Sequence, residues 1–171
     1  VVDGRIYAFG GLIYDGSTYA AQTLAEVMAD PGGAGTWDDA AVADLPAPSA
    51  EGRAFGFDSD SIYGPDWANK IVLAGGGAWP EQTADALAYD VASNTYDASF
   101  PDLINARRDH AGVFVPAATD DPYDGLPGMW VLGGRITFDD PPYGPAEVFS
   151  FPEPVLWQAG PDVPDCSNRN R

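Results

Sequence analysis

The chain is poor in the residues that carry most enzyme chemistry, with one histidine (His110) and one cysteine (Cys166). A single cysteine cannot form a disulfide within the chain, so Cys166 is either a free thiol or paired with a residue elsewhere. Cysteine usage therefore does not determine whether the protein occupies an oxidising or a reducing compartment. The same scarcity excludes a His/Cys cluster with the spacing of a zinc site.

Basic residues are scarce as well. Eight Lys and Arg, only one of them lysine (Lys70), stand against 26 Asp and Glu, and the formal net charge is -18. A field of this sign repels nucleic acid and anionic lipid headgroups and favours cations and basic partners. The favoured interpretation is a solvated acidic surface that keeps the protein soluble. No stretch approaches the roughly 20 apolar residues of a membrane span. We therefore expect neither a nucleic-acid partner nor a membrane span.

Long uninterrupted segments are also missing, because 20 Gly and 16 Pro residues punctuate the chain. Only the alanine-rich segment Tyr19–Ala29 is long enough between breakers to form a helix. The rest consists of short Val, Ile, Leu, Tyr and Phe runs between turn residues, which is typical of β-strands. The length of 171 residues fits one domain, and 45% of them are hydrophobic, enough to bury a core. We predict an all-β fold.

Three short apolar runs each end in a glycine pair: RIYAFGG (Arg5–Gly11), KIVLAGG (Lys70–Gly76) and GMWVLGG (Gly128–Gly134). After a variable loop comes a second run: TLAEVMAD (Thr23–Asp30), DALAYD (Asp85–Asp90) and PAEVFSF (Pro145–Phe151). A third run carries an aromatic residue, namely Trp37, Tyr96 or Trp157. A fourth leads into the next cycle: GRAFGF (Gly52–Phe57) and HAGVFVP (His110–Pro116). Ordered landmarks with unequal spacing indicate fixed strands and variable loops.

Four short strands per unit, repeated at roughly 50 residues, are the sequence signature of propeller blades. The order of landmarks resembles the kelch repeat: an apolar run, Gly-Gly, a Tyr-Asp strand at Tyr89-Asp90, an aromatic residue, and Arg-x-x-His at Arg107 and His110. The chain departs from this pattern at three places. Tyr96 replaces Trp in the middle unit, Phe149-Ser150 replaces Tyr-Asp in the last, and Glu51 and Ala54 are taken as the Arg-x-x-His positions one unit earlier.

The resemblance covers nearly the whole chain and implies three four-stranded blades of a kelch-type β-propeller, in approximate repeats 1–57, 58–117 and 118–171. A closed ring typically needs four to eight blades, so further blades or other chains are expected to complete it. Glycine tolerates positive φ and close backbone approach, and a large ring on an outer strand fills the gap between blades. The glycine pairs, Trp37, Tyr96 and Trp157 are therefore expected to be architectural.

Numbering the strands of a blade one to four from the axis outward sorts the loops onto two faces. The one–two loops are a tight Asp3-Gly4 turn and two long acidic segments, 58–69 and 118–128. The long segments carry six carboxylates: Asp58, Asp60, Asp66, Asp120, Asp121 and Asp124. Such oxygen-rich loops suit Ca²⁺, but the spacing matches no EF-hand loop. Solvated loops are the favoured interpretation and calcium the alternative, and we expect no cofactor.

The two–three loops share the opposite face, which carries candidate partner-binding residues: Tyr14, Tyr19, Trp79, Arg135, Phe138 and Tyr143. Tyr, Trp and Arg are enriched at interface hot spots, and the kelch resemblance implies a partner site on this face. The alternative is that these rings pack locally and hold long loops in place.

Catalytic chemistry has few candidates. AGGGAW lacks the Lys-Ser/Thr of a phosphate-binding loop, and no serine is positioned against His110, which we expect to bond structurally with backbone. We therefore expect a non-catalytic protein-interaction or structural scaffold, within a larger secreted or surface protein. The alternative is a non-catalytic portion of a propeller enzyme that acts on carbohydrate or oxidises small alcohols.

Overall fold

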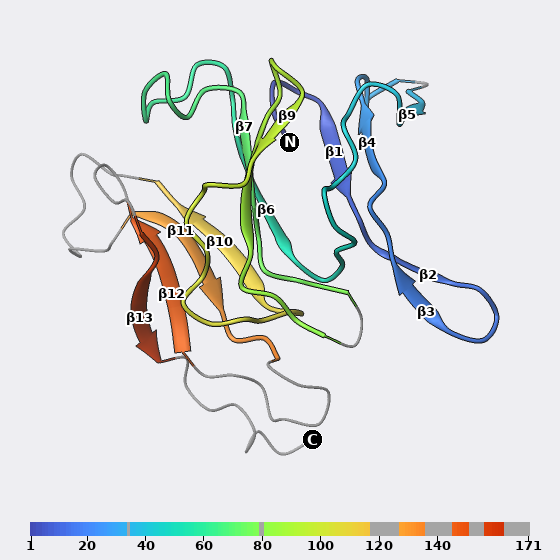
Figure 1. Ribbon diagram of the computed structural model, residues 1–171. Coiled ribbons are helices and arrows are strands. Elements are labelled where there is room, and N and C mark those ends of the chain that lie inside the picture. Colours follow the sequence, from blue (N-terminus) through green and yellow to red (C-terminus); the bar gives the residue numbers. More distant parts are fainter. Residues whose placement is uncertain (34, 79–80, 117–126, 136–144, 151–155, 163–171) are drawn as a thin grey trace.

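The computed structural model describes residues 1–33, 35–78, 81–116, 127–135, 145–150 and 156–162 (Figure 1). These residues form 13 strands in four antiparallel sheets and no helix, which confirms the all-β prediction. The helix candidate Tyr19–Ala29 instead contains strands β3 (Tyr19–Ala21) and β4 (Ala25–Met28). In β4 alternate residues, Ala25 and Val27, are buried, which is the two-residue period of a strand. None of the described elements is a helix with the length and apolarity needed to cross a membrane.

Three of the sheets follow one another along the chain. The first has the order β1-β4-β5, with β1 at Ile6–Phe9 and β5 at Trp37–Asp38. The second has the order β6-β7-β8-β9: Arg53–Phe57, Lys70–Ala74, Ala86–Asp90 and Thr95–Asp97. The third has the order β10-β11-β12-β13: Ala111–Val115, Gly128–Leu132, Pro145–Ser150 and Gln158–Asp162. A separate hairpin joins β2 (Leu12–Tyr14) to β3.

The second and third sheets are simple meanders, in which each strand pairs with the next one in the chain. Strands β6 and β10 pair with the strands that follow them. Each sheet therefore begins one strand earlier than the approximate repeat boundaries at 58 and 118.

The pairing register aligns the three units residue by residue. Trp37 lies opposite Met28 in the first sheet, and Tyr96 lies opposite Tyr89 in the second. In the third, Gln158 lies opposite Val148, which places the preceding Trp157 at the same position. The three aromatic residues are thus structural equivalents, as their order in the sequence predicts.

The glycine pairs occupy backbone that other residues adopt only with strain. Gly75 and Gly76 have φ of 63° and 96°, and the pairs at 10–11 and 133–134 are also positive. A Cβ on Gly75 would lie 2.7 Å from the carbonyl oxygen of Arg107, and one on Gly76 would lie 2.6 Å from that of Ala50. The expected positive φ and close backbone approach are both present.

Two apolar cores lie between successive sheets, so the second sheet packs between the other two (Figure 1). The core between the first and second sheets contains Val2, Ala25, Val27, Val42, Ile71 and Tyr89. The core between the second and third sheets contains Phe55, Phe57, Val72, Ala74, Met129, Val131, Phe149 and Trp157, among others. Burial of this apolar surface is the main favourable term that holds the sheets together.

The outer aromatic residues behave as predicted in the second and third units but not in the first. Trp157 is 4% exposed, and its Nε1 donates to the Pro101 carbonyl at 3.0 Å. The Tyr96 hydroxyl donates to the Ala43 carbonyl at 2.7 Å. Both bonds reach back to the preceding unit. Trp37 belongs to the first described unit, has no such neighbour among the described residues and is 44% exposed, so its predicted burial is wrong.

Candidate functional site

Hairpin β2–β3 carries two of the predicted partner-binding residues. Tyr14 and Tyr19 lie directly opposite each other, with ring centroids 4.8 Å apart. Each is 55% exposed, as is the neighbouring Ile13. Figure 1 shows the hairpin extending away from the other sheets at the lower right. The two rings therefore pack on each other and still present their outer surfaces to solvent.

The turn of this hairpin holds the tyrosine pair in place. The backbone N–H groups of Thr18 and Ser17 both donate to Asp15 Oδ1 at 2.8 Å. These bonds favour the ionised carboxylate and lower the pKa of Asp15. Gly16 adopts a φ of 97° within the turn. The hairpin is thus shaped before any partner binds, which reduces the ordering cost of an interface.

The remaining predicted partner-binding residues do not extend this surface. Arg135 follows β11, and its side chain pairs with exposed Asp109 at 3.6 Å. An exposed pair of this kind contributes little to stability. Trp79, Phe138 and Tyr143 lie outside the described residues. Among the described candidates, the structure brings together Tyr14 and Tyr19 alone.

The acidic loops are described only in part, since Asp120, Asp121 and Asp124 lie outside the described residues. In the other loop, Asp58 Oδ1 accepts the backbone N–H of Asp3 at 2.6 Å. Asp3 in turn accepts the N–H of Ser59 at 3.0 Å. The Asp3-Gly4 turn forms as predicted, with both φ values positive and a bridge from Val2 to Arg5. In the part of the chain that the structure describes, no group of three or more His, Cys, Asp or Glu residues could hold a metal ion.

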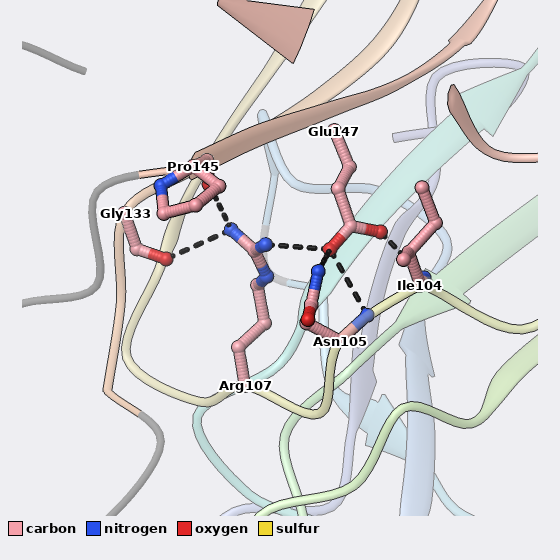
Figure 2. A network of polar contacts seen from close by, with 6 residues as sticks. All are labelled: Ile104, Asn105, Arg107, Gly133, Pro145 and Glu147. Atoms are coloured by element: carbon pink, nitrogen blue, oxygen red, sulfur yellow. Dashed lines mark hydrogen bonds and ion pairs between the residues drawn. The ribbon is translucent and has the colours of Figure 1, made fainter. Parts of the chain in front are cut away.

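Arg107 is the centre of a buried polar network that the sequence analysis did not predict (Figure 2). Its guanidinium donates to the carbonyls of Gly133 and Pro145 at 3.0 and 2.8 Å. It also donates to Glu147 Oε1 at 2.5 Å. The two charged side chains are 0% and 1% exposed. Such a pair is tolerated only where further hydrogen bonds satisfy both ions.

Glu147 receives those further bonds from the segment before Arg107. Its Oε2 accepts the N–H of Ile104 at 2.6 Å, and its Oε1 accepts the N–H and side-chain amide of Asn105 at 3.1 and 3.0 Å. The network therefore ties strand β12 to the connection between the second and third sheets. The sequence signal for it was an acid inside a buried strand, in the Ala-Glu-Val run of the third unit.

His110 lies under two of the glycine pairs and is fully buried. Its Cε1 would lie 2.8 Å from a Cβ on Gly75, and its Cβ would lie 2.8 Å from a Cβ on Gly134. Burial, followed by the positive charges of Arg53 and Arg107, lowers the pKa of His110 to about 4. The imidazole is therefore neutral at pH 7. The imidazole faces the backbone of Ala74, and a hydrogen bond there opposes this lowering of the pKa, although neither ring nitrogen has a partner of good geometry among the described residues.

The equivalents of Arg107 and His110 one unit earlier are Ser49 and Gly52, which corrects the assignment to Glu51 and Ala54. The carbonyl of Ser49 accepts the N–H of Gly11, as that of Arg107 accepts the N–H of Gly76. The strands β6 and β10 then begin four residues after Ser49 and Arg107. Glu51 instead pairs with Arg108 at 2.5 Å. The error arose because strand register cannot be read from unequal loops.

The geometry described so far defines an all-β chain of three successive, similarly built sheets. No family model and no curated protein matches it. A solved structure described as "Structure of YjhT" is similar, with a TM-score of 0.60 and 13% sequence identity. The match covers 92% of this chain and 51% of that one, so the chain spans about half the length of that structure. At this identity the likeness concerns the fold alone.

Proposed function

We propose that the three sheets are consecutive kelch-like blades of a β-propeller, and that the chain is a non-catalytic protein-interaction or structural scaffold within a larger protein. The repeated strand order and shared register support the blade assignment. The observation that carries the function is the exposed tyrosine pair on hairpin β2–β3. Tyrosine supplies large contact area at low entropic cost and is enriched at interface hot spots.

The placement of the charged and titratable groups favours a scaffold over an enzyme. Arg107, Glu147 and His110 are all fully buried. Arg107 and Glu147 bond to each other and to backbone, and His110 fills the space beside the glycine pairs. These groups hold sheets together, and no observation on the described residues favours the enzyme alternative.

The chemistry of the partner follows from the charge and from the tyrosines. A net charge of -18 steers basic proteins toward this chain. The partner we propose presents an apolar or aromatic centre to Tyr14 and Tyr19, surrounded by Lys and Arg. Such a partner would lose affinity as ionic strength rises.

The test compares the binding of a captured partner to the wild-type protein and to Tyr14→Ala/Tyr19→Ala. We expect the double substitution to weaken binding at least about 10-fold, as for a hot-spot pair. The melting temperature should change little, because both rings are half exposed. Ile62→Ala is the matched control, since Ile62 is 78% exposed on another loop. Equal binding by all three proteins would rule out the hairpin as the partner site.

A further inference from the structure

A cavity of about 400 Å³ lies between the first and second sheets. Tyr7 and Phe9 of β1 line one side, and Leu73 and Leu87 of the second sheet line the other. The connection 45–54 borders it as well. The Tyr7 and Phe9 rings are nearly parallel, with an interplanar angle of 10° and centroids 6.3 Å apart.

The corresponding place between the second and third sheets is occupied by the guanidinium of Arg107. Leu87 is the register equivalent of Glu147, because they lie opposite Leu73 and Val131 in matching strands. Ser49 is the equivalent of Arg107, and its side chain is too short to reach across. The carbonyls that hold the guanidinium, at Gly133 and Pro145, correspond to those of Gly75 and Asp85, which line the cavity. The cavity is thus the same site without its internal cation.

The other members of the network change in concert. Pro46 is the equivalent of Ile104, because the residues that precede them make the same backbone bond. The N–H of Leu45 donates to the Thr23 carbonyl, and the N–H of Leu103 donates to the Ala84 carbonyl. Proline has no N–H, so Pro46 has no donor that would need a carboxylate acceptor at the position of Leu87. The apolar side chain of Leu87 leaves no unpaired donor at Pro46, and Ala47, at the position of Asn105, lacks the side-chain amide that bonds Glu147.

The charges around the cavity favour a cation. Of the three acidic residues that line it, Glu51 is already paired with Arg108, which leaves Asp85 and Asp102 against one lining cation, Arg53. Among the described residues, no donor reaches the Gly75 carbonyl. The aromatic faces of Tyr7 and Phe9 suit a guanidinium, which is planar, weakly hydrated and well able to stack.

We propose that this cavity binds a guanidinium group on an apolar stem. The Gly75 carbonyl and the carboxylates of Asp85 and Asp102 accept from the guanidinium fork, as the carbonyls of Gly133 and Pro145 do for Arg107. Leu73 and Leu87 contact the stem. The group is supplied either by a small guanidinium compound or by an arginine side chain of a partner polypeptide. A lysine ammonium, a compact point charge, fits the paired acceptors less well.

The binding test uses the purified protein with three probes, followed by calorimetry or NMR. The probes are N-acetyl-arginine methylamide, its lysine counterpart, and a neutral peptide that contains one arginine. We expect the arginine compound to bind at least 10-fold more tightly than the lysine compound. Binding of the arginine compound supports a small-molecule source, and binding of the peptide alone supports a partner polypeptide. Equal affinity for arginine and lysine, or no binding of either arginine probe, overturns the proposal.

The location is tested by filling the cavity from within. Ser49→Arg places a guanidinium where Arg107 places its own, and should weaken probe binding at least 10-fold. Ile62→Arg is the control, because Ile62 is 78% exposed and is not one of the residues that line the cavity. Leu87→Glu keeps the cavity open, adds the equivalent of Glu147, and should tighten binding of the arginine probe. Unfolding curves establish that each variant is folded. Unchanged affinity in folded Ser49→Arg and Leu87→Glu overturns the assignment.

Discussion

At the residue scale, His110 and the glycines depend on each other. The absence of a Cβ on Gly75 and Gly134 leaves the space that the imidazole fills. Enclosure in turn keeps the imidazole neutral, because a buried charge beside Arg53 and Arg107 would be unfavourable. This position therefore uses the shape and the neutrality of the His110 imidazole and not its acid–base chemistry.

This arrangement predicts that acid destabilises the protein through His110. The folded pKa of about 4 lies below the ordinary 6.5, so the unfolded chain takes up a proton over that range and the folded chain does not. The contribution of His110 to stability is complete above pH 6.5 and is lost as the pH falls toward 4. Between pH 7.5 and 5.0 we expect a loss of about 2 kcal/mol, measured by urea unfolding.

His110→Gln should abolish most of this loss. The carboxylates with lowered pKa values, Asp15, Asp90 and Asp97, start from 3.8 and titrate below this window. An equal loss in wild type and variant would show that His110 is not the group responsible.

At the scale of elements, one buried ion pair attaches strand β12 to the connection that precedes β10. Arg107 and Glu147 are 40 residues apart in the chain and join segments that no local interaction holds together. The same position between the first and second sheets uses Leu87 and Ser49 and leaves a cavity. Two neighbouring interfaces of one fold are therefore stabilised by different means.

We expect Arg107→Met to lower the free energy of unfolding by about 3–5 kcal/mol, because it leaves the Glu147 carboxylate buried without its counter-ion. A matched control is Arg135→Met, which breaks an exposed pair and should cost less than about 1 kcal/mol. Chemical denaturation measures both. Similar losses in the two variants would contradict the structural role assigned to Arg107.

At the scale of the whole molecule, the sheets are stacked in series, and the outer aromatic residues Tyr96 and Trp157 each bond to the unit before them. Trp37 is chemically equipped for the same contact, yet it is 44% exposed. Val113 and Phe114 of β10 are also exposed, at 45% and 36%. Apolar faces of this kind promote association with another sheet.

Residues 1–171 expressed alone should therefore self-associate at micromolar concentration, in spite of the charge of -18. Trp37→Lys should shift the sedimentation profile toward monomer, and Ile62→Lys, which adds the same charge on an exposed loop, should not. A wild-type monomer with a sharp cooperative melt and no binding of an apolar dye would contradict the proposal that these sheets are propeller blades.

The sequence by itself determined the features that depend on neighbouring residues. Apolar runs of strand length, the positive-φ glycine pairs, the Asp3-Gly4 turn and the order of Trp37, Tyr96 and Trp157 all follow from local backbone and burial preferences. The exposed tyrosines at 14 and 19 could be proposed in the same way, because a loop between two buried runs must reach the surface.

Only the tertiary structure decided the features that depend on register and on which sheet covers which. It placed Ser49 at the position equivalent to Arg107 and paired Arg107 with Glu147. It also left a cavity beside Leu87 and left Trp37 exposed. The physical reason is that a contact between residues 40 or more positions apart depends on every intervening loop. Loop lengths vary from unit to unit, while the strands they connect do not.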